Sequence, residues 1–312
     1  MEQIDATQVW QRLPVAAAVD ALEQAITAGG FPDGPPRMHL EDAGQTLLVM
    51  PSLAGGWAGV KLVTIDPDNP GRGLALVNGV YGLFAPPGLE PVAVIDGRAL
   101  TELRTAAVSG LATRYLARPG ASRLVIFGAG AQGRSHLLAM HAVLDLEDVR
   151  IVAPRRESVT EYLRFASRHL EVPVLEGSPE DVANADVVCT CTSSTTPVFD
   201  GSLLPDGVHV NAIGAYRPDM QEVDATVVAS SRVVVEVRES ALAEKGDLLV
   251  AEQAGTWQRE AIVADLTQLL RDGIAGRDSP DQRTLFASVG HAYEDLIVAR
   301  AIVESTSRAV KR

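Results

Sequence analysis

The stretch of the chain that decides the fold is Arg123–Gly133, which reads Arg-Leu-Val-Ile-Phe-Gly-Ala-Gly-Ala-Gln-Gly. The apolar run before Gly128 is typical of a buried strand, and a helix is predicted from about residue 131 to 143. Gly128 permits a tight turn, Gly130 lets the backbone approach a pyrophosphate, and Gly133 allows the helix to pack closely on the strand. Because a helix N-terminus also attracts phosphate, we predict a Rossmann dinucleotide-binding unit here rather than a glycine-rich turn without a ligand.

Strands and helices continue to alternate after this unit. A helix is predicted at 156–169, and further strands at 149–153, 172–175, 187–190, 208–213 and 233–237. Apolar strands that alternate with helices indicate a parallel sheet covered on both faces. The sequence therefore predicts an α/β fold in which the Rossmann domain spans residues 120–292.

The end of the second strand of such a domain usually selects the cofactor. An acidic residue there would bind the ribose 2′-hydroxyl of NAD, but the chain reads Ala153-Pro-Arg155-Arg156 before its first carboxylate at Glu157. Two guanidinium groups suit a 2′-phosphate, so we expect NADPH to be preferred over NADH. The alternative is that both arginines are simply solvated at a helix start.

Small and hydroxyl residues follow other strands of the predicted sheet, at the edge where ligands of parallel sheets gather. We expect the segment after residue 190 to line the nicotinamide side of the cofactor, although an ordinary capped loop is an alternative. The expected cofactor contacts are Gly128, Ala129, Gly130, Ala131, Gln132, Gly133, Arg155, Arg156, Thr190, Thr192, Ser193, Ile213, Val289 and Gly290.

The N-terminal third has a different texture, with short strands between turn-rich segments. Helices are predicted at 14–28 and 100–116, and strands at 46–50, 59–65, 74–77 and 91–95, with a turn at Asp96-Gly97. The segment from Thr284 is predicted to be a loop and then a helix over 292–310. We expect this helix to pack back on the N-terminal third, which gives a discontinuous α+β domain of residues 1–119 and 293–312.

Composition narrows the class of protein. The 312 residues suggest two domains, and 40 acidic against 27 basic residues give a formal net charge of −13, which disfavours nucleic acid as a partner. No apolar stretch approaches the roughly 18 residues of a membrane span, and the first residues lack a signal-peptide pattern. Two cysteines, Cys189 and Cys191, are too few for a disulfide framework, so we expect a cytoplasmic protein in which both are buried on one strand face. The histidine spacing predicts no metal site.

Several motifs outside the glycine turn resemble those of the ornithine cyclodeaminase/mu-crystallin family, over essentially the whole chain. The resemblance implies a Rossmann domain joined to an open-barrel-like domain that dimerises and carries substrate residues, with an amino or imino acid as substrate. The matching segments are Val49–Pro51, Lys61–Thr64, Leu103–Ser109, Gly128–Gln132, Asn211–Gly214, Arg217–Asp219, Ser288–Gly290 and Glu294-Asp295.

The resemblance also implies which residues meet the substrate carboxylate. Arg37, Lys61 and Arg104 match the family's cationic positions, and we place Met50 beside them in the substrate site. An acidic protein that binds a carboxylate needs such local cations, and arginine can clasp it bidentately. A lysine inside an apolar strand is costly unless it is paired or functional, which favours a role for Lys61.

Two departures from the family pattern narrow the reaction. The resemblance implies that the cyclodeaminase branch carries a glutamate at position 48 and a catalytic aspartate at position 216, where this chain has Leu48 and Tyr216. Neither residue is suited to activate water at neutral pH. We therefore expect an NAD(P)H-dependent reductase of cyclic ketimine carboxylates, a homodimer. Lys61 either keeps the imine nitrogen electrophilic through its charge or relays a proton, and Tyr216 or a water is the other possible proton donor. The alternatives are ornithine cyclodeaminase, another amino-acid dehydrogenase, or a non-catalytic protein that binds NADPH and a small ligand.

Overall fold

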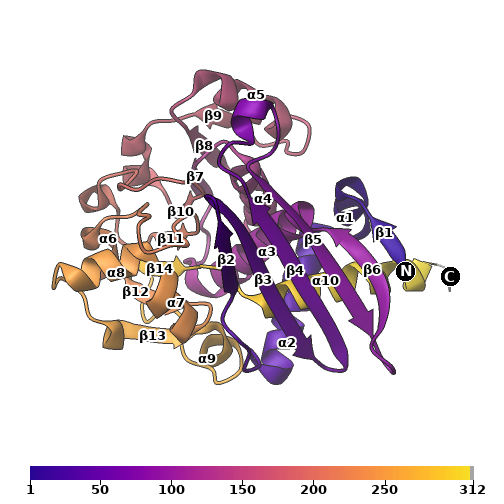
Figure 1. Cartoon of the computed structure of the whole chain (residues 1–312). Helices are drawn as coiled ribbons and strands as arrows, with labels where there is room; N and C mark the ends of the chain where they lie inside the picture. The colour runs from indigo at the N-terminus through magenta and orange to yellow at the C-terminus, as the bar shows by residue number, and fades with distance from the viewer. Residues whose placement is uncertain (310–312) are drawn as a thin grey trace. The chain divides into compact units, whose positions relative to one another are not determined.

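The computed structural model describes residues 1–309, and the chain divides into two compact units (Figure 1). The first, here called the mixed-sheet unit, comprises Met1–Ala25, Phe31–Thr105 and the residues from His291. The second, the parallel-sheet unit, comprises Ile26–Gly30 and Ala106–Gly290. The sequence predicts these boundaries at 119/120 and 292/293, and it does not predict that residues 26–30 belong to the second unit.

The mixed-sheet unit is built on one six-stranded sheet in the order β1-β6-β5-β4-β3-β2, antiparallel except for the β1–β6 pair. Helix α10 packs on β3, β4 and β5, and α1 packs on α10 and β6. Its strands are β1 (Glu2–Ile4), β2 (Met38–Asp42), β3 (Gln45–Ala54), β4 (Trp57–Ile65), β5 (Val77–Ala85) and β6 (Glu90–Asp96). Its helices are α1 (Ala6–Arg12), most of α2 (Val15–Gly29), η1 (Pro70–Arg72), the start of α3 (Gly97–Leu116) and α10 (Ala292–Ala309).

The two faces of this sheet differ in character. Met50, Lys61 and Tyr81 lie directly opposite one another on β3, β4 and β5, and all three are buried. The neighbouring row, which must point to the other face, contains Leu62 and Val80, and both are exposed. The sheet therefore buries one face, which holds the lysine, and leaves an apolar face in solvent.

The parallel-sheet unit contains eight parallel strands in the order β13-β12-β14-β11-β10-β7-β8-β9. They are β7 (Arg123–Phe127), β8 (Asp148–Val152), β9 (Val174–Glu176), β10 (Val187–Thr190), β11 (His209–Ala212), β12 (Arg232–Val235), β13 (Ile262–Asp265) and β14 (Thr284–Ala287). The helices are the rest of α3, α4 (Ala131–Val143), α5 (Arg156–Ala166), η2 (Pro179–Asn184), η3 (Gly201–Leu203), α6 (Ala225–Ser230), α7 (Arg238–Glu244), α8 (Gly246–Gln253), η4 (Arg259–Ala261) and α9 (Leu266–Leu270).

The strand order of this sheet reverses at β7. From β7 the chain continues outward to β8 and β9, and then returns to the other side of β7 to form β10. Ligands of open α/β sheets bind outside the carboxyl ends of the strands at such a switch point. We therefore expect a ligand site beside the residues that follow β7 and β10.

Some expected elements were wrong. The strand predicted at 74–77 is absent, because the strand is β5, which begins only at Val77 and continues through a glycine-containing segment. Strands β1, β2, β13 and β14 were missed, and the predicted loop from Thr284 begins with β14. The turn predicted at Asp96-Gly97 is instead a direct passage from β6 into α3, because the Asp96 carboxylate accepts hydrogen bonds from the first amides of that helix.

The structure also bears on the predicted extent of the last helix and on the predicted burial of the two cysteines. Helix α10 begins at Ala292 as predicted, and position 310, its expected end, lies outside the residues described. Cys189 is buried in β10, whereas Cys191 follows the strand and is only partly buried. Within residues 1–309 no helix is both long and apolar enough to cross a membrane, and no group of three acidic, histidine or cysteine residues could hold a metal.

Candidate functional site

The turn after β7 contains three glycines, and the surroundings of each one differ. Gly128 has a φ of +102°, and a Cβ on it would run into the carbonyl of Cys191. A Cβ on Gly133 would run into the carbonyl oxygen of Gly128. A Cβ on Gly130, by contrast, would meet no protein atom within 4 Å. Chain packing thus explains Gly128 and Gly133, while Gly130 borders open space next to the N-terminus of α4, where a phosphate could approach.

Arg155 and Arg156 lie just beyond the carboxyl end of β8, the strand beside β7. Arg155 is the N-cap residue of α5 and Arg156 its first residue, and both are exposed. The amide of Gly128 donates to the carbonyl of Val152 at 2.9 Å, which ties the glycine turn to the end of β8. Two exposed guanidinium groups are therefore presented at the strand end that usually meets the adenosine ribose.

Two of the residues expected at the end of β10, Thr190 and Thr192, converge on a carboxylate that the sequence did not indicate, Glu222. Thr190 is fully buried and its hydroxyl donates to Glu222 Oε2 at 2.9 Å, while Thr192 donates to Glu222 Oε1 through both its amide (2.6 Å) and its hydroxyl (2.8 Å). Ser193 is exposed, and Ile213 is buried and donates its amide to the carbonyl of Thr190. Burial raises the pKa of Glu222, against the opposing influence of a nearby lysine.

The residues expected after β14 converge in the same way on Glu236. The amides of Val289 and Gly290 donate to Glu236 Oε2 at 3.0 and 2.6 Å, and the Ser288 hydroxyl donates to Oε1 at 2.6 Å. Glu236 is 1% exposed and directly follows the apolar strand β12. A charge in an apolar run needs a partner, so the sequence indicates Glu236 by the same signal as Lys61.

The mixed-sheet unit holds a second cluster of charges on the buried face of its sheet. Lys61 is 2% exposed and its Nζ lies 3.0 and 2.8 Å from the two carboxylate oxygens of Asp295. Arg104, from α3, is 6% exposed and donates to Glu294 at 2.9 Å, with its Nε 3.3 Å from Asp295. Both carboxylates lie in the first turn of α10, where the helix dipole favours negative charge.

Burial gives Lys61 an unusual protonation equilibrium. Desolvation lowers the pKa of Lys61 to about 8; Asp295 opposes this, and the positive charges of Arg104 and Arg37 add to the lowering. Arg37, half-buried just before β2, is thus close enough to influence the lysine electrostatically. The structure brings Lys61 and Arg104 together around Asp295 and places the buried Met50 directly opposite Lys61 on β3. An amine with this pKa can exchange a proton near neutral pH.

Tyr81 is a neighbour of this cluster that the sequence did not indicate. It lies opposite Lys61 on β5, is fully buried, and its hydroxyl finds no hydrogen-bond partner among the described residues. Only a glycine at position 59 leaves room for the Tyr81 hydroxyl. Burial raises the pKa of Tyr81, and the charge of Asp295 adds to the rise, so the phenol keeps its proton. Tyr216, the residue proposed from the sequence, belongs to the parallel-sheet unit and is half-buried.

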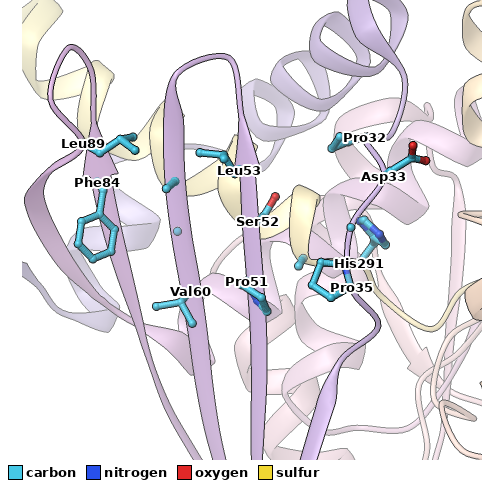
Figure 2. Close-up of a pocket in the computed structure, with 14 residues that line it drawn as sticks. Pro32, Asp33, Pro35, Pro51, Ser52, Leu53, Val60, Phe84, Leu89 and His291 are labelled. Atoms are coloured by element: carbon cyan, nitrogen blue, oxygen red, sulfur yellow. The ribbon is translucent and has the colours of Figure 1, made fainter.

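A pocket of about 500 Å³ lies at the tip of the β3–β4 hairpin in the mixed-sheet unit (Figure 2). Its walls are mainly apolar, and its polar side chains are Asp33, Ser52 and His291. The pairing of β3 with β2 ends before Pro51. Next to Pro51, residues 32–35 and the start of α10 form the wall of the pocket. Lys61 and Arg104 are not among the lining residues, so this pocket differs from the charged cluster.

Comparison with known proteins gives consistent results. The sequence pattern of the ornithine cyclodeaminase/mu-crystallin family matches residues 3–309. A Delta(1)-pyrroline-2-carboxylate reductase of Bacillus cereus is 40% identical over 264 residues, 83% of this chain and 81% of that protein. The ketimine reductase mu-crystallin of Rattus norvegicus is 34% identical over 249 residues, 79% of this chain and 75% of that protein.

Two solved structures are similar over nearly the whole chain. The Delta(1)-pyrroline-2-carboxylate reductase of Thermococcus litoralis, in complex with NADH and L-proline, has a TM-score of 0.92 and 27% identity, covering 99% of this chain and 98% of that one. An archaeal alanine dehydrogenase dimer with bound NAD has a TM-score of 0.91 and 30% identity, covering 99% and 97%.

Proposed function

Because the chain belongs to the ornithine cyclodeaminase/mu-crystallin family, we propose that it is an NAD(P)H-dependent reductase of cyclic ketimine carboxylates, such as Δ1-pyrroline-2-carboxylate. The observation that carries the proposal is the buried pair of Lys61 and Arg104, whose charges are balanced by two carboxylates of α10. The identity of 40% to a Delta(1)-pyrroline-2-carboxylate reductase supports the choice of substrate class.

The cofactor is proposed to bind at the carboxyl edge of the parallel sheet. The open space beside Gly130, the N-terminus of α4 and the exposed Arg155 and Arg156 suit a dinucleotide whose adenosine carries a 2′-phosphate. We therefore propose NADPH as the preferred form, with NADH as the alternative. When bound, the reduced nicotinamide supplies the hydride that the imine carbon accepts.

The residues of the mixed-sheet unit are proposed to bind and protonate the substrate. Arg37 and Arg104 hold the substrate carboxylate through charge and hydrogen bonding. Lys61, as the ammonium, donates one proton to the imine nitrogen, so that the C=N bond gains a hydride on carbon and a proton on nitrogen and becomes a secondary amine. Asp295 orients Lys61 and stabilises its charged form before the transfer.

The absence of two acidic groups separates this reaction from cyclodeamination. Leu48, at the position where the cyclodeaminase pattern has a glutamate, is 7% exposed and apolar. Tyr216 occupies the position of the second acid. A water molecule that attacks an iminium carbon would lack a base at both positions.

The test is oxidation of NADPH and of NADH, followed by absorbance, with five- and six-membered cyclic imino acids. We expect Δ1-pyrroline-2-carboxylate to be reduced to L-proline with equimolar cofactor consumption. Consumption only with pyruvate and ammonia would identify an alanine dehydrogenase, and formation of proline from ornithine with catalytic NAD would identify a cyclodeaminase. No consumption with any cyclic ketimine would contradict the proposal.

We further propose that the exposed apolar face of the mixed sheet joins two copies of this chain in a homodimer. Met38, Val49, Leu62 and Val80 form one cross-strand row on that face, and Met38, Leu62 and Val80 are exposed. Exposed apolar rows of this kind mark interfaces, and the similar archaeal alanine dehydrogenase is a dimer. Leu62→Glu should convert the dimer to a monomer in sedimentation; a wild-type monomer would contradict the proposal.

A further inference from the structure

Glu222 is saturated with donors that come from two different loops. Its Oε1 accepts from the amide and hydroxyl of Thr192, and its Oε2 accepts from the Thr190 hydroxyl and from the amides of Gly214 (2.5 Å) and Ala215 (3.2 Å). Thr190 and Thr192 lie at the end of β10, and the two amides follow β11. One buried carboxylate therefore fixes the carboxyl ends of two adjacent parallel strands.

The loop after β11 packs tightly against Thr192 and Glu222. A Cβ on Gly214 would collide with the carbonyl of Thr192 and come within 2.6 Å of Glu222 Oε1. Thr192 lies near the glycine turn, because a Cβ on Gly128 would come within 3.3 Å of its methyl group. The residue that Glu222 holds, Thr192, therefore borders the turn at which the dinucleotide is proposed to bind.

Glu222 is itself held in place by two buried charged residues. Asp247 accepts hydrogen bonds from the amides of Glu222 (2.6 Å) and Val223 (3.0 Å), and Lys245 pairs with Asp247 at 3.0 Å. Lys245 also donates to the carbonyl of Ala212, the last residue of β11. Glu222, Lys245 and Asp247 are all fully buried. Each of these buried charges therefore has a partner, and Lys245 joins Asp247, in the first turn of α8, to the end of β11.

Glu236 holds the carboxyl end of β14, the next strand beside β11, in a similar way. It directly follows β12 and gathers the three donors of residues 288–290 after β14. The strands β14, β11 and β10 are consecutive neighbours that lead to β7. Two glutamates together fix the carboxyl ends of all three.

We infer that Glu222 and Glu236 are positioning residues that hold the loops after β10, β11 and β14 in the shape that receives the nicotinamide half of the cofactor. The inference rests on the proposed function, because it concerns the same dinucleotide site. Neither glutamate contacts the cofactor in this proposal, since their carboxylate oxygens are occupied by the loops themselves. The adenosine and pyrophosphate half, which belongs to the glycine turn and β8, depends on them much less.

Asp186 provides a comparison at the opposite end of the same strands, their amino ends. It is 3% exposed, directly precedes β10, and accepts from the amides of Ser122 and Arg123 at 3.1 and 3.0 Å. It is therefore also a buried carboxylate that gathers backbone amides, although it pairs in addition with the guanidinium groups of Arg118 and Arg123. It lies at the amino ends of the strands, where ligands of parallel sheets do not bind. Loss of Asp186 should lower stability without altering the cofactor site.

The experiment compares binding of NADH and NADPH with binding of ADP-ribose, which lacks the nicotinamide, by calorimetric titration of the full chain. In Glu222→Gln an NH2 group replaces one of two accepting oxygens, so at least one loop loses its acceptor. We expect dinucleotide binding about tenfold weaker and ADP-ribose binding changed less than about twofold. Glu236→Gln should act in the same direction, whereas Asp186→Asn should lower the melting temperature and leave the ratio of the two affinities unchanged.

The outcomes separate the inference from the proposed function. A wild-type chain that binds neither NADH nor NADPH would refute the proposed function before any variant is made. Wild-type binding with an unchanged affinity ratio in both glutamate variants, or equal loss for dinucleotide and ADP-ribose, would overturn the inference alone. If Glu222→Gln does not fold, Thr190→Val removes one donor to the same carboxylate and should shift the ratio about twofold to threefold; an unchanged ratio there would also overturn it.

Discussion

The protein contains two buried clusters of charge that use the same residue types in different ways. In the mixed-sheet unit, the carboxylates of Glu294 and Asp295 pair with the side-chain cations Arg104 and Lys61. In the parallel-sheet unit, the carboxylate of Glu222 is occupied by amides and hydroxyls of two loops. The first cluster balances charge against charge, and the second uses charge to fix the backbone.

The difference teaches which buried charge can take part in chemistry. A carboxylate whose lone pairs are all taken by backbone donors stabilises one loop conformation and has little left for a ligand. Lys61, in contrast, is stabilised by Asp295 but destabilised by burial and by neighbouring positive charges, so its pKa falls to about 8. Three predictions test this contrast, and a fourth concerns exposed charges.

The largest expected effect is that of Arg104→Ala. Arg104 is proposed to pair with the substrate carboxylate, and losing one partner of a buried, hydrogen-bonded charge pair typically costs about 2–5 kcal/mol of binding free energy. We therefore expect kcat/KM for a cyclic ketimine to fall roughly 1,000-fold. Arg98→Ala is the matched control, because Arg98 lies exposed on the same helix α3 and should leave the kinetics unchanged. Wild-type kinetics in Arg104→Ala would remove this residue from the site.

The two buried lysines offer a direct comparison of the clusters. Lys61→Met should lower kcat about 100-fold because the proposed proton donor is lost, with a modest loss of stability since Arg104 still contacts Asp295. Lys245→Met leaves Asp247 without its cation and should cost about 3–5 kcal/mol in the free energy of unfolding. Kinetics and urea denaturation of both variants check the contrast, and equal stability losses in the two would contradict it.

The pH profile of the wild-type enzyme sharpens the same contrast. The ammonium form of Lys61 predominates below its pKa of about 8, so kcat/KM for reduction should fall about tenfold per pH unit above that value. Stability should change in the opposite direction, because between pH 8 and 10.5 the unfolded chain binds more protons than the folded one at this lysine. If Lys61→Met retains the alkaline limb, the titrating group is the substrate or another residue.

The parts of the fold that local sequence predicts are those whose cause is local. The strand-turn-helix over 123–143 is confirmed, because the positive φ of Gly128 and the contact of Gly133 with the Gly128 carbonyl arise within the turn itself. Strand β5 was missed because Gly79 and Gly82 weaken its pattern, and it forms only through pairing with β4 and β6.

The charged clusters depend on contacts that sequence spacing cannot show. Lys61 and Asp295 are 234 residues apart, and Thr192 and Glu222 are 30 apart across two strands. An unpaired charge in an apolar run predicts that a partner exists, but not which residue it is. The roles of the cofactor residues remain predictions for the same reason, since a strand end shows where a ligand could lie and not which one.

The smallest effect concerns the choice of cofactor at such a strand end. Arg155 and Arg156 are exposed, so water and salt screen their interaction with a 2′-phosphate, and each is expected to contribute only modestly. The double variant Arg155→Ala/Arg156→Ala should lower the ratio of kcat/KM for NADPH to that for NADH about tenfold, mainly through a higher KM for NADPH. Arg164→Ala, exposed near the end of the same helix α5, is the control. An equal loss with both cofactors would mean that the arginines support the helix start, and a wild-type preference for NADH would assign them to solvent.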